Sequence, residues 1–142
     1  MSIKQNQTLM DFLPPVSIFS NQKTGIVTSY RRYQPELSDC LRPTLVFLHG
    51  FNGSSKSWAC QFAHFTGHQV IAVDAPGFGQ SHAYEGDMAT IAAEVAALIS
   101  SLVTDKVVII GHSMGGMLAQ MLGALHPQLC AALILSCTHK GR

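Results

Sequence analysis

Short apolar runs alternate along this sequence with segments whose apolar residues recur every three or four positions. The apolar runs are rich in branched residues and span 44–48, 69–73, 107–110 and 131–136. Such runs are typical of strands that are buried on both faces of a parallel sheet. Two further β-prone runs, 16–20 and 26–33, flank a turn-like segment and predict a hairpin near the N-terminus.

Three segments between the apolar runs show the spacing of amphipathic helices. Their apolar positions are Trp58, Phe62 and Phe65 in the first, Met88, Ile91, Val95, Leu98, Ile99 and Leu102 in the second, and Met117, Leu118, Met121, Leu122 and Leu125 in the third. Ser54, Ser55 or Ser57 provides a cap for the first helix. Strands that alternate with such helices predict an α/β fold with right-handed connections and a site at the carboxyl ends of the strands.

The run 107–110 leads almost without a loop into the third helix, through a Gly-x-Ser-x-Gly turn at 111–115. A turn this tight forces its middle residue into strained backbone angles and lifts its side chain above the sheet. Ser113 then lies at a helix N-terminus, where backbone N–H groups favour developing negative charge. The pattern predicts a nucleophilic serine. The alternative is an ordinary glycine-rich turn with a capping serine.

With this turn the sequence resembles the α/β-hydrolase superfamily, and two further segments carry the resemblance. They are His49-Gly50-Phe51-Asn52-Gly53, directly after a buried strand, and Asp74-Ala75-Pro76-Gly77-Phe78-Gly79-Gln80-Ser81, after the next. The second is similar to the D-x-P-G-x-G-x-S segment of the branch that holds epoxide hydrolases, dehalogenases, enol-lactonases and carbon–carbon bond hydrolases. The resemblance implies an α/β-hydrolase fold, with a mostly parallel sheet and flanking helices.

The resemblance also implies roles for individual residues. The backbone N–H groups of Phe51 and Met114 would form the oxyanion hole. Ser113 as nucleophile implies acyl transfer on an ester, lactone, thioester or activated C–C bond, whereas members with an aspartate nucleophile open epoxides or displace halide. Asp74 is interpreted as a turn-bracing carboxylate rather than the acid of a catalytic triad. The residues expected to shape the site are His49, Gly50, Gly111, His112 and Gly115.

The sequence departs from the family pattern after the serine. In the family an Asp or Glu and then a histidine follow the nucleophile. After Ser113 this sequence has no Asp or Glu, and its later histidines are His126 and His139. We expect His126 to lie at the far end of the helix and His139 to lack an orienting carboxylate. The chain is therefore expected to be the N-terminal half of the family's domain, 15–142, behind a loose leader, 1–14.

On this expectation the sheet is truncated after about six strands, and the substrate cap, the triad acid and the base are absent. The simplest explanation is a truncated gene product or an incomplete sequence. The run 131–136 would then be an unprotected apolar edge strand.

The composition and charge indicate which classes of binding partner to expect. The 142 residues are 47% hydrophobic and 12% charged, with a formal net charge of +1, so there is no electrostatic footprint for nucleic acid. No apolar run reaches the length of a membrane span, and the polar start lacks the features of a signal peptide. The four cysteines fit no metal-binding spacing. We expect a cytoplasmic protein with a small-molecule substrate, without a cofactor, metal, nucleic-acid or membrane partner, whose oligomeric state is open.

Three functional hypotheses follow. The first is a serine hydrolase that uses Ser113 and a backbone oxyanion hole. The second is a catalytically silent homologue that binds a small molecule or a partner subunit. The third is a cofactor-free lyase or haloperoxidase-like enzyme that uses the same site. The nucleophile favours the first hypothesis, and the missing base favours the second.

Overall fold

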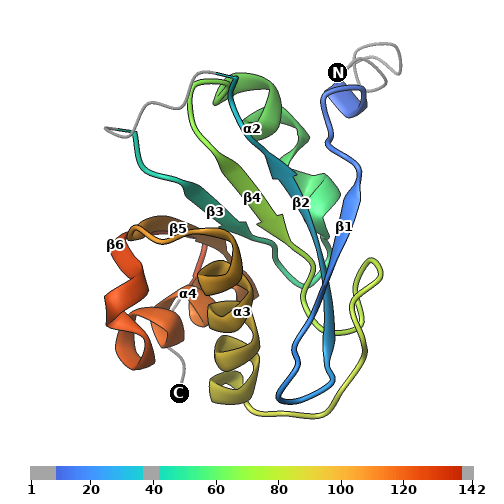
Figure 1. Cartoon of the computed structure of the whole chain (residues 1–142), viewed down its shortest axis with the longest axis vertical. Helices are drawn as coiled ribbons and strands as arrows, with labels where there is room; N and C mark the ends of the chain where they lie inside the picture. Colours follow the sequence, from blue (N-terminus) through green and yellow to red (C-terminus); the bar gives the residue numbers. More distant parts are fainter. Residues whose placement is uncertain (1–8, 37–41, 139–142) are drawn as a thin grey trace.

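The computed structural model describes residues 9–36 and 42–138, whose centre is a six-stranded sheet (Figure 1). The strands lie in the order β1-β2-β4-β3-β5-β6. Their bounds are β1 Val16–Ser20, β2 Val27–Tyr33, β3 Leu45–Leu48, β4 Val70–Val73, β5 Val107–His112 and β6 Cys130–Ser136. The pairs β1–β2 and β2–β4 are antiparallel, and the pairs from β4 through β3 and β5 to β6 are parallel.

Helices cover the two faces of the sheet unequally. Their bounds are η1 Ser55–Trp58 and η2 Pro127–Leu129, both 3₁₀ helices, and α2 Ala59–His64, α3 Met88–Leu102 and α4 Met114–Leu125. The helices α3 and α4 pack on the face that carries Val46 and Ile109 (Figure 1). On the other face, Phe62 of α2 packs with Phe47. Among the described residues, no helix combines the length and the apolar character needed to cross a membrane.

The core explains the continuous apolar runs in the sequence. Successive side chains of a strand point to opposite faces of the sheet. Because helices cover both sides of β3 and β4, every residue of these two strands is buried. A strand in this position has no polar face, which is why its sequence shows no alternation.

The structure confirms the predicted elements, with boundaries that shift by a few residues. β5 continues beyond the predicted run, through Gly111 to His112. The first helix begins with a 3₁₀ turn, and Ser54 is its cap. The Ser54 hydroxyl accepts the Lys56 N–H at 3.2 Å, and the Ser57 hydroxyl accepts the Ser54 N–H at 3.1 Å. These reciprocal bonds form a capping box.

The last strand is the exposed apolar edge that the sequence predicts. Within residues 9–36 and 42–138, β6 lies at the end of the strand order and pairs with β5 alone. Ile134 is 53% exposed and Leu135 is 44% exposed, whereas Leu133 packs against the core beneath α4. Residues 1–8 of the expected leader lie outside the described residues. Leu13, in contrast, packs on the α2 side of the sheet.

Candidate active site

Three parallel strands end at the same level of the sheet and bring their following loops together. Leu48 of β3 is in register with Val73 of β4 and with Gly111 of β5. The chain leaves these strands as the loop 49–53, the loop 74–81 and the turn at Ser113. The three segments that sequence analysis singled out are therefore neighbours in space, at the carboxyl ends of the strands.

The loop after β3 is pressed against the turn that follows β5. A Cβ atom added to Gly50 would come within 3.2 Å of the Cβ of Ser113, closer than side-chain carbons usually approach. A Cβ atom added to Gly115 would overlap the backbone carbonyl of Leu48. The position of Gly115 therefore leaves room only for glycine, whereas a side chain at Gly50 would require its neighbours to shift by a few tenths of an ångström. The first turn of α4 thus packs directly on the end of β3.

Ser113 has the strained backbone that the motif predicts. Its φ of 55° and ψ of −116° lie outside the regions that L-residues ordinarily adopt. Such a conformation costs about 1–3 kcal/mol and must be held by its surroundings. Its N–H donates to the Ser136 carbonyl at 2.9 Å, and its own carbonyl accepts the Gly116 N–H at 2.9 Å and the Thr138 hydroxyl at 2.8 Å. The end of β6 therefore helps to hold the turn.

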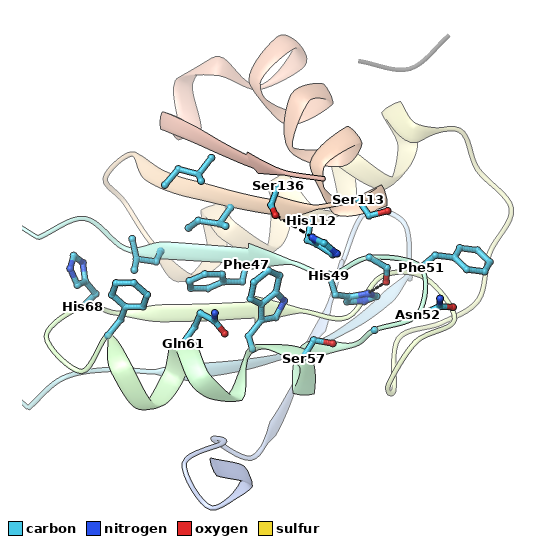
Figure 2. A pocket seen from close by; sticks show the side chains of 17 residues that line it. Phe47, His49, Phe51, Asn52, Ser57, Gln61, His68, His112, Ser113 and Ser136 are labelled. Carbon is cyan, nitrogen blue, oxygen red and sulfur yellow. Dashed lines mark hydrogen bonds between the residues drawn. The ribbon is translucent and has the colours of Figure 1, made fainter. Parts of the chain in front are cut away.

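The side chain of Ser113 faces a groove of about 800 Å³ (Figure 2). In the described residues, the Ser113 hydroxyl makes no hydrogen bond and does not cap α4. The capping-serine interpretation of the turn is therefore wrong. Both polar residues, such as Ser113 and His112, and aromatic residues, such as Phe47 and Phe65, line this groove.

Two backbone N–H groups beside the groove have no acceptor. They belong to Phe51, in the loop after β3, and to Met114, the first residue of α4. Neither group donates a hydrogen bond within the described residues. The first N–H groups of any helix lack partners inside the helix, and here they flank Ser113. The Phe51 side chain is 71% exposed and points away from the groove, so only its backbone faces the site (Figure 2).

His49 joins the loops that follow β3 and β4. It is 2% exposed, and its Nε2 atom accepts the Ala75 N–H at 3.0 Å. Because Nε2 accepts, the ring proton of the neutral imidazole is on Nδ1, which donates to the Gly50 carbonyl at 2.7 Å. The ring also packs edge-on against Phe78, with centroids 4.9 Å apart. Both nitrogens are therefore occupied by backbone groups and do not reach Ser113.

Asp74 braces the loop after β4, as the sequence analysis proposed. Its carboxyl group is 1% exposed and accepts the Ser55 N–H and the Ser29 hydroxyl, each at 2.7 Å. The Ser81 hydroxyl donates to the Asp74 carbonyl at 2.7 Å. Gly79, at a φ of +54°, lies so close to the carboxyl group that a side chain would overlap it. The interpretation as a turn-bracing residue is confirmed.

Two residues that hold the loops of the site were not identified from the sequence. Ser29, on β2, is fully buried and links Asp74 to the Gln80 N–H. Thr138 follows β6 and contacts Ser113. The one signal for Ser29 is a small polar residue within a β-prone run. Nothing local marks Thr138.

No described histidine forms a hydrogen bond with the Ser113 hydroxyl. His112 lines the groove, and its Nδ1 lies 3.3 Å from the Ser136 hydroxyl (Figure 2). His126 ends α4, a helix of 12 residues that spans about 18 Å at the usual rise per residue. His139 lies outside the described residues. The structure thus brings the serine and two backbone donors together, without an imidazole and carboxylate pair among the described residues.

These features define an α/β protein with a strained Gly-x-Ser-x-Gly turn between a parallel strand and a helix. A family model described as "alpha/beta hydrolase fold" matches residues 43–141, and the chain belongs to this family.

Three similar proteins are hydrolases by name, and each is longer than this chain. Epoxide hydrolase 4 of Mus musculus is 31% identical over 99 residues, which cover 66% of this chain and 28% of that protein. "Putative carbamate hydrolase RutD" of Serratia proteamaculans is 36% identical over 99 residues, which cover 67% of this chain and 37% of that protein. The crystal structure of a hydrolase from Pseudomonas aeruginosa PA01 matches with a TM-score of 0.75 at 25% identity, over 87% of this chain and 46% of that one. The chain spans less than half the length of each.

Proposed function

We propose that Ser113 is the nucleophile of a hydrolase that transfers the acyl group of a small ester, lactone, thioester or activated C–C substrate to water. The observation that carries this proposal is the geometry of the turn. Ser113 has a strained backbone, its hydroxyl makes no hydrogen bond among the described residues, and it lines a groove. The N–H groups of Phe51 and Met114, which have no acceptor among the described residues, lie beside it. This is the arrangement that acyl transfer requires.

The chemistry would proceed in two stages. The Ser113 oxygen attacks the substrate's carbonyl carbon, and the carbonyl oxygen becomes negatively charged in a tetrahedral intermediate. The N–H groups of Phe51 and Met114 donate to that oxygen. One such donor is typically worth about 3 kcal/mol of transition-state stabilisation. Departure of the leaving group gives an acyl-serine, which water then hydrolyses to the acid and free Ser113.

The hydroxyl proton of Ser113 needs an acceptor during the attack. Both nitrogens of His49 are engaged with backbone groups. In this proposal the histidine base and its carboxylate partner therefore lie outside the described residues. Without a base, the oxyanion hole and substrate binding provide only residual catalysis, about 10³- to 10⁴-fold above water in serine proteases.

The identity of the nucleophile favours acyl transfer over epoxide opening. Attack of a serine oxygen on an epoxide carbon would give an ether, which water does not cleave under mild conditions. Attack on an acyl carbon gives an ester, which the same oxyanion hole can help to hydrolyse. The name of RutD, a carbamate hydrolase, agrees with acyl chemistry better than that of Epoxide hydrolase 4 does.

The test compares the natural polypeptide that carries this sequence with its Ser113→Ala variant, using p-nitrophenyl acetate as substrate. Ser100→Ala is the matched control, because Ser100 is an exposed serine on α3. We expect Ser113→Ala to lower kcat/KM by at least about 100-fold and Ser100→Ala to leave it unchanged. A fluorophosphonate probe should add its mass to Ser113. Equal background rates for all three proteins would contradict the proposal and favour the silent binding protein.

A further inference from the structure

The two non-glycine residues with positive φ in the described chain lie next to each other across two strands. Ser113 has a φ of 55° and Cys137 has a φ of 50°. They follow His112 of β5 and Ser136 of β6, which are paired in the parallel ladder. Each residue makes a sharp turn directly after its strand. The chain beyond β6 therefore changes direction beside the turn at Ser113.

This change of direction places Thr138 on the first turn of α4. A Cβ atom added to Gly116 would lie 2.5 Å from the Cβ of Thr138, so the two residues are in direct contact. The Thr138 hydroxyl donates to the Ser113 carbonyl at 2.8 Å. Thr138 thus touches the helix start at a place where only glycine leaves enough room.

The Ser113 carbonyl, which accepts this hydrogen bond, belongs to the same peptide group as the Met114 N–H, the proposed oxyanion donor. The Ser113 C=O and the Met114 N–H belong to one planar peptide, and the described residues contain no cis peptide bond. In a trans peptide the two groups point in opposite directions. A donor that fixes the carbonyl on one side therefore fixes the direction of the N–H on the other. A hydrogen bond to the carbonyl also polarises the peptide and strengthens its N–H as a donor.

We propose that Thr138 is a positioning residue that orients and polarises the Met114 N–H for the developing oxyanion. This inference rests on the proposed function of Ser113 and Met114. The Ser113 carbonyl also accepts the N–H groups of Gly116 at 2.9 Å and Met117 at 3.3 Å. Those two donors belong to α4 and move with it. Thr138 comes from the end of β6, so its bond ties the peptide to the sheet.

Two variants of the natural polypeptide separate the hydroxyl from the packing. Thr138→Val keeps the shape and removes the donor, whereas Thr138→Ser keeps the donor and loses a methyl group. We expect Thr138→Val to lower kcat for p-nitrophenyl acetate by about 5- to 30-fold, less than the 10²- to 10³-fold loss of a whole oxyanion donor. KM should change less than about twofold, because the effect acts on the transition state. Thr138→Ser should restore kcat to within about threefold of wild type.

A second readout does not depend on activity. In an amide NMR spectrum, the Met114 proton should move upfield in Thr138→Val, because its peptide is less polarised, and return in Thr138→Ser. If Ser113→Ala is as active as wild type, the proposed function fails. The Met114 amide resonance then tests by itself whether Thr138 polarises the Ser113–Met114 peptide. An unmoved Met114 resonance in Thr138→Val would overturn the inference. So would Ser113-dependent turnover that Thr138→Val leaves unchanged, or that Thr138→Ser fails to restore.

Discussion

His49 and Ala75 connect the loops that follow two neighbouring strands, through a hydrogen bond of 3.0 Å from the Ala75 N–H to Nε2. The other nitrogen of the same ring holds the Gly50 carbonyl at 2.7 Å. One buried side chain therefore ties the loop that carries the Phe51 N–H to the loop that follows β4. Both ring nitrogens of His49 are therefore bonded to backbone groups of these loops.

We predict that His49→Ala lowers the free energy of unfolding by about 1–3 kcal/mol, because it leaves the buried Ala75 N–H without an acceptor, whereas the Gly50 carbonyl keeps the Gly53 N–H as its donor. The matched control is His64→Ala, since His64 is an exposed histidine at the end of α2. The control should change stability by less than about 0.5 kcal/mol. Urea unfolding followed by far-UV circular dichroism measures both. Equal midpoints for the two variants would show that the His49 bonds carry no stability.

The elements of the fold were predictable because each leaves a pattern in its own residues. The run 107–110 has no polar face, since Val107 and Ile109 are buried on one side of β5 and Val108 and Ile110 are partly buried on the other. The spacing of Met117, Leu118, Met121, Leu122 and Leu125 records the face of α4 that meets the sheet. The order of the strands in the sheet produces no pattern in the sequence of any one strand. It arises from pairings between residues far apart in sequence, such as Val46 with Ile71 and Ile109.

Two glycines of α4 provide a test of the contact between this helix and the end of β3. In an exposed helix, replacing glycine by alanine stabilises by about 1 kcal/mol. At Gly115 the added methyl group would overlap the Leu48 carbonyl, a rigid backbone group. We expect Gly115→Ala to destabilise by about 1–3 kcal/mol and to lower Ser113-dependent activity.

Gly123→Ala is the matched control for that prediction. A Cβ atom there would come within 2.9 Å of Cδ1 of Leu133, the movable end of a side chain. This variant should be neutral or up to about 1 kcal/mol more stable, with unchanged activity. Thermal unfolding and the ester assay measure both variants. A stabilised, fully active Gly115→Ala would mean that the helix start does not pack on β3 as described.

A second pair of glycines separates backbone strain from crowding around Asp74. Gly79 and Gly25 both have positive φ, +54° and +74°. A methyl group at Gly25 meets nothing within 4 Å, whereas at Gly79 it would overlap the Asp74 carboxyl group. Gly25→Ala should therefore cost about 1 kcal/mol from strain alone. We expect Gly79→Ala to cost about 1–3 kcal/mol more, because the carboxyl group must move from its partners. Urea unfolding measures the stability of both variants. Equal losses of unfolding free energy would contradict the crowding of Gly79 by the Asp74 carboxyl group.

The candidate site was predictable only as far as its residues belong to local motifs. Ser113, Met114 and the His49-Gly50-Phe51 segment stand next to the glycines that their turns require, so short stretches of sequence identify them. Thr138, which follows β6, bonds Ser113, and Ser29, on β2, bonds Asp74 in the loop after β4. Their roles depend on the parallel register of β5 with β6 and on the place of β2 beside β4. No spacing within the chain encodes these two relationships.

The phenol of Tyr84 gives a prediction for alkaline pH. Burial, and after it the charge of Glu94, raise the pKa of Tyr84 from 10.0 to about 12. The folded state therefore holds this proton more tightly than the unfolded state. Its contribution to stability is fully present below pH 10 and is lost as the pH rises toward about 12. Tyr84→Phe should remove this part of the alkaline loss of stability.

The tyrosinate absorbance of wild type minus that of Tyr84→Phe isolates this phenol, because the sequence has three tyrosines. We expect a midpoint well above 10.0, with circular dichroism used to confirm that the protein is still folded. In Glu94→Gln the midpoint should fall but stay above 10.0, since burial is the larger cause. A titration midpoint at the ordinary value of 10.0 in the folded wild type would contradict the burial of Tyr84 beside α3.

The Glu94→Gln substitution should also weaken the contact between the hairpin turn and α3, because the Glu94 carboxyl accepts the Thr24 hydroxyl at 2.8 Å.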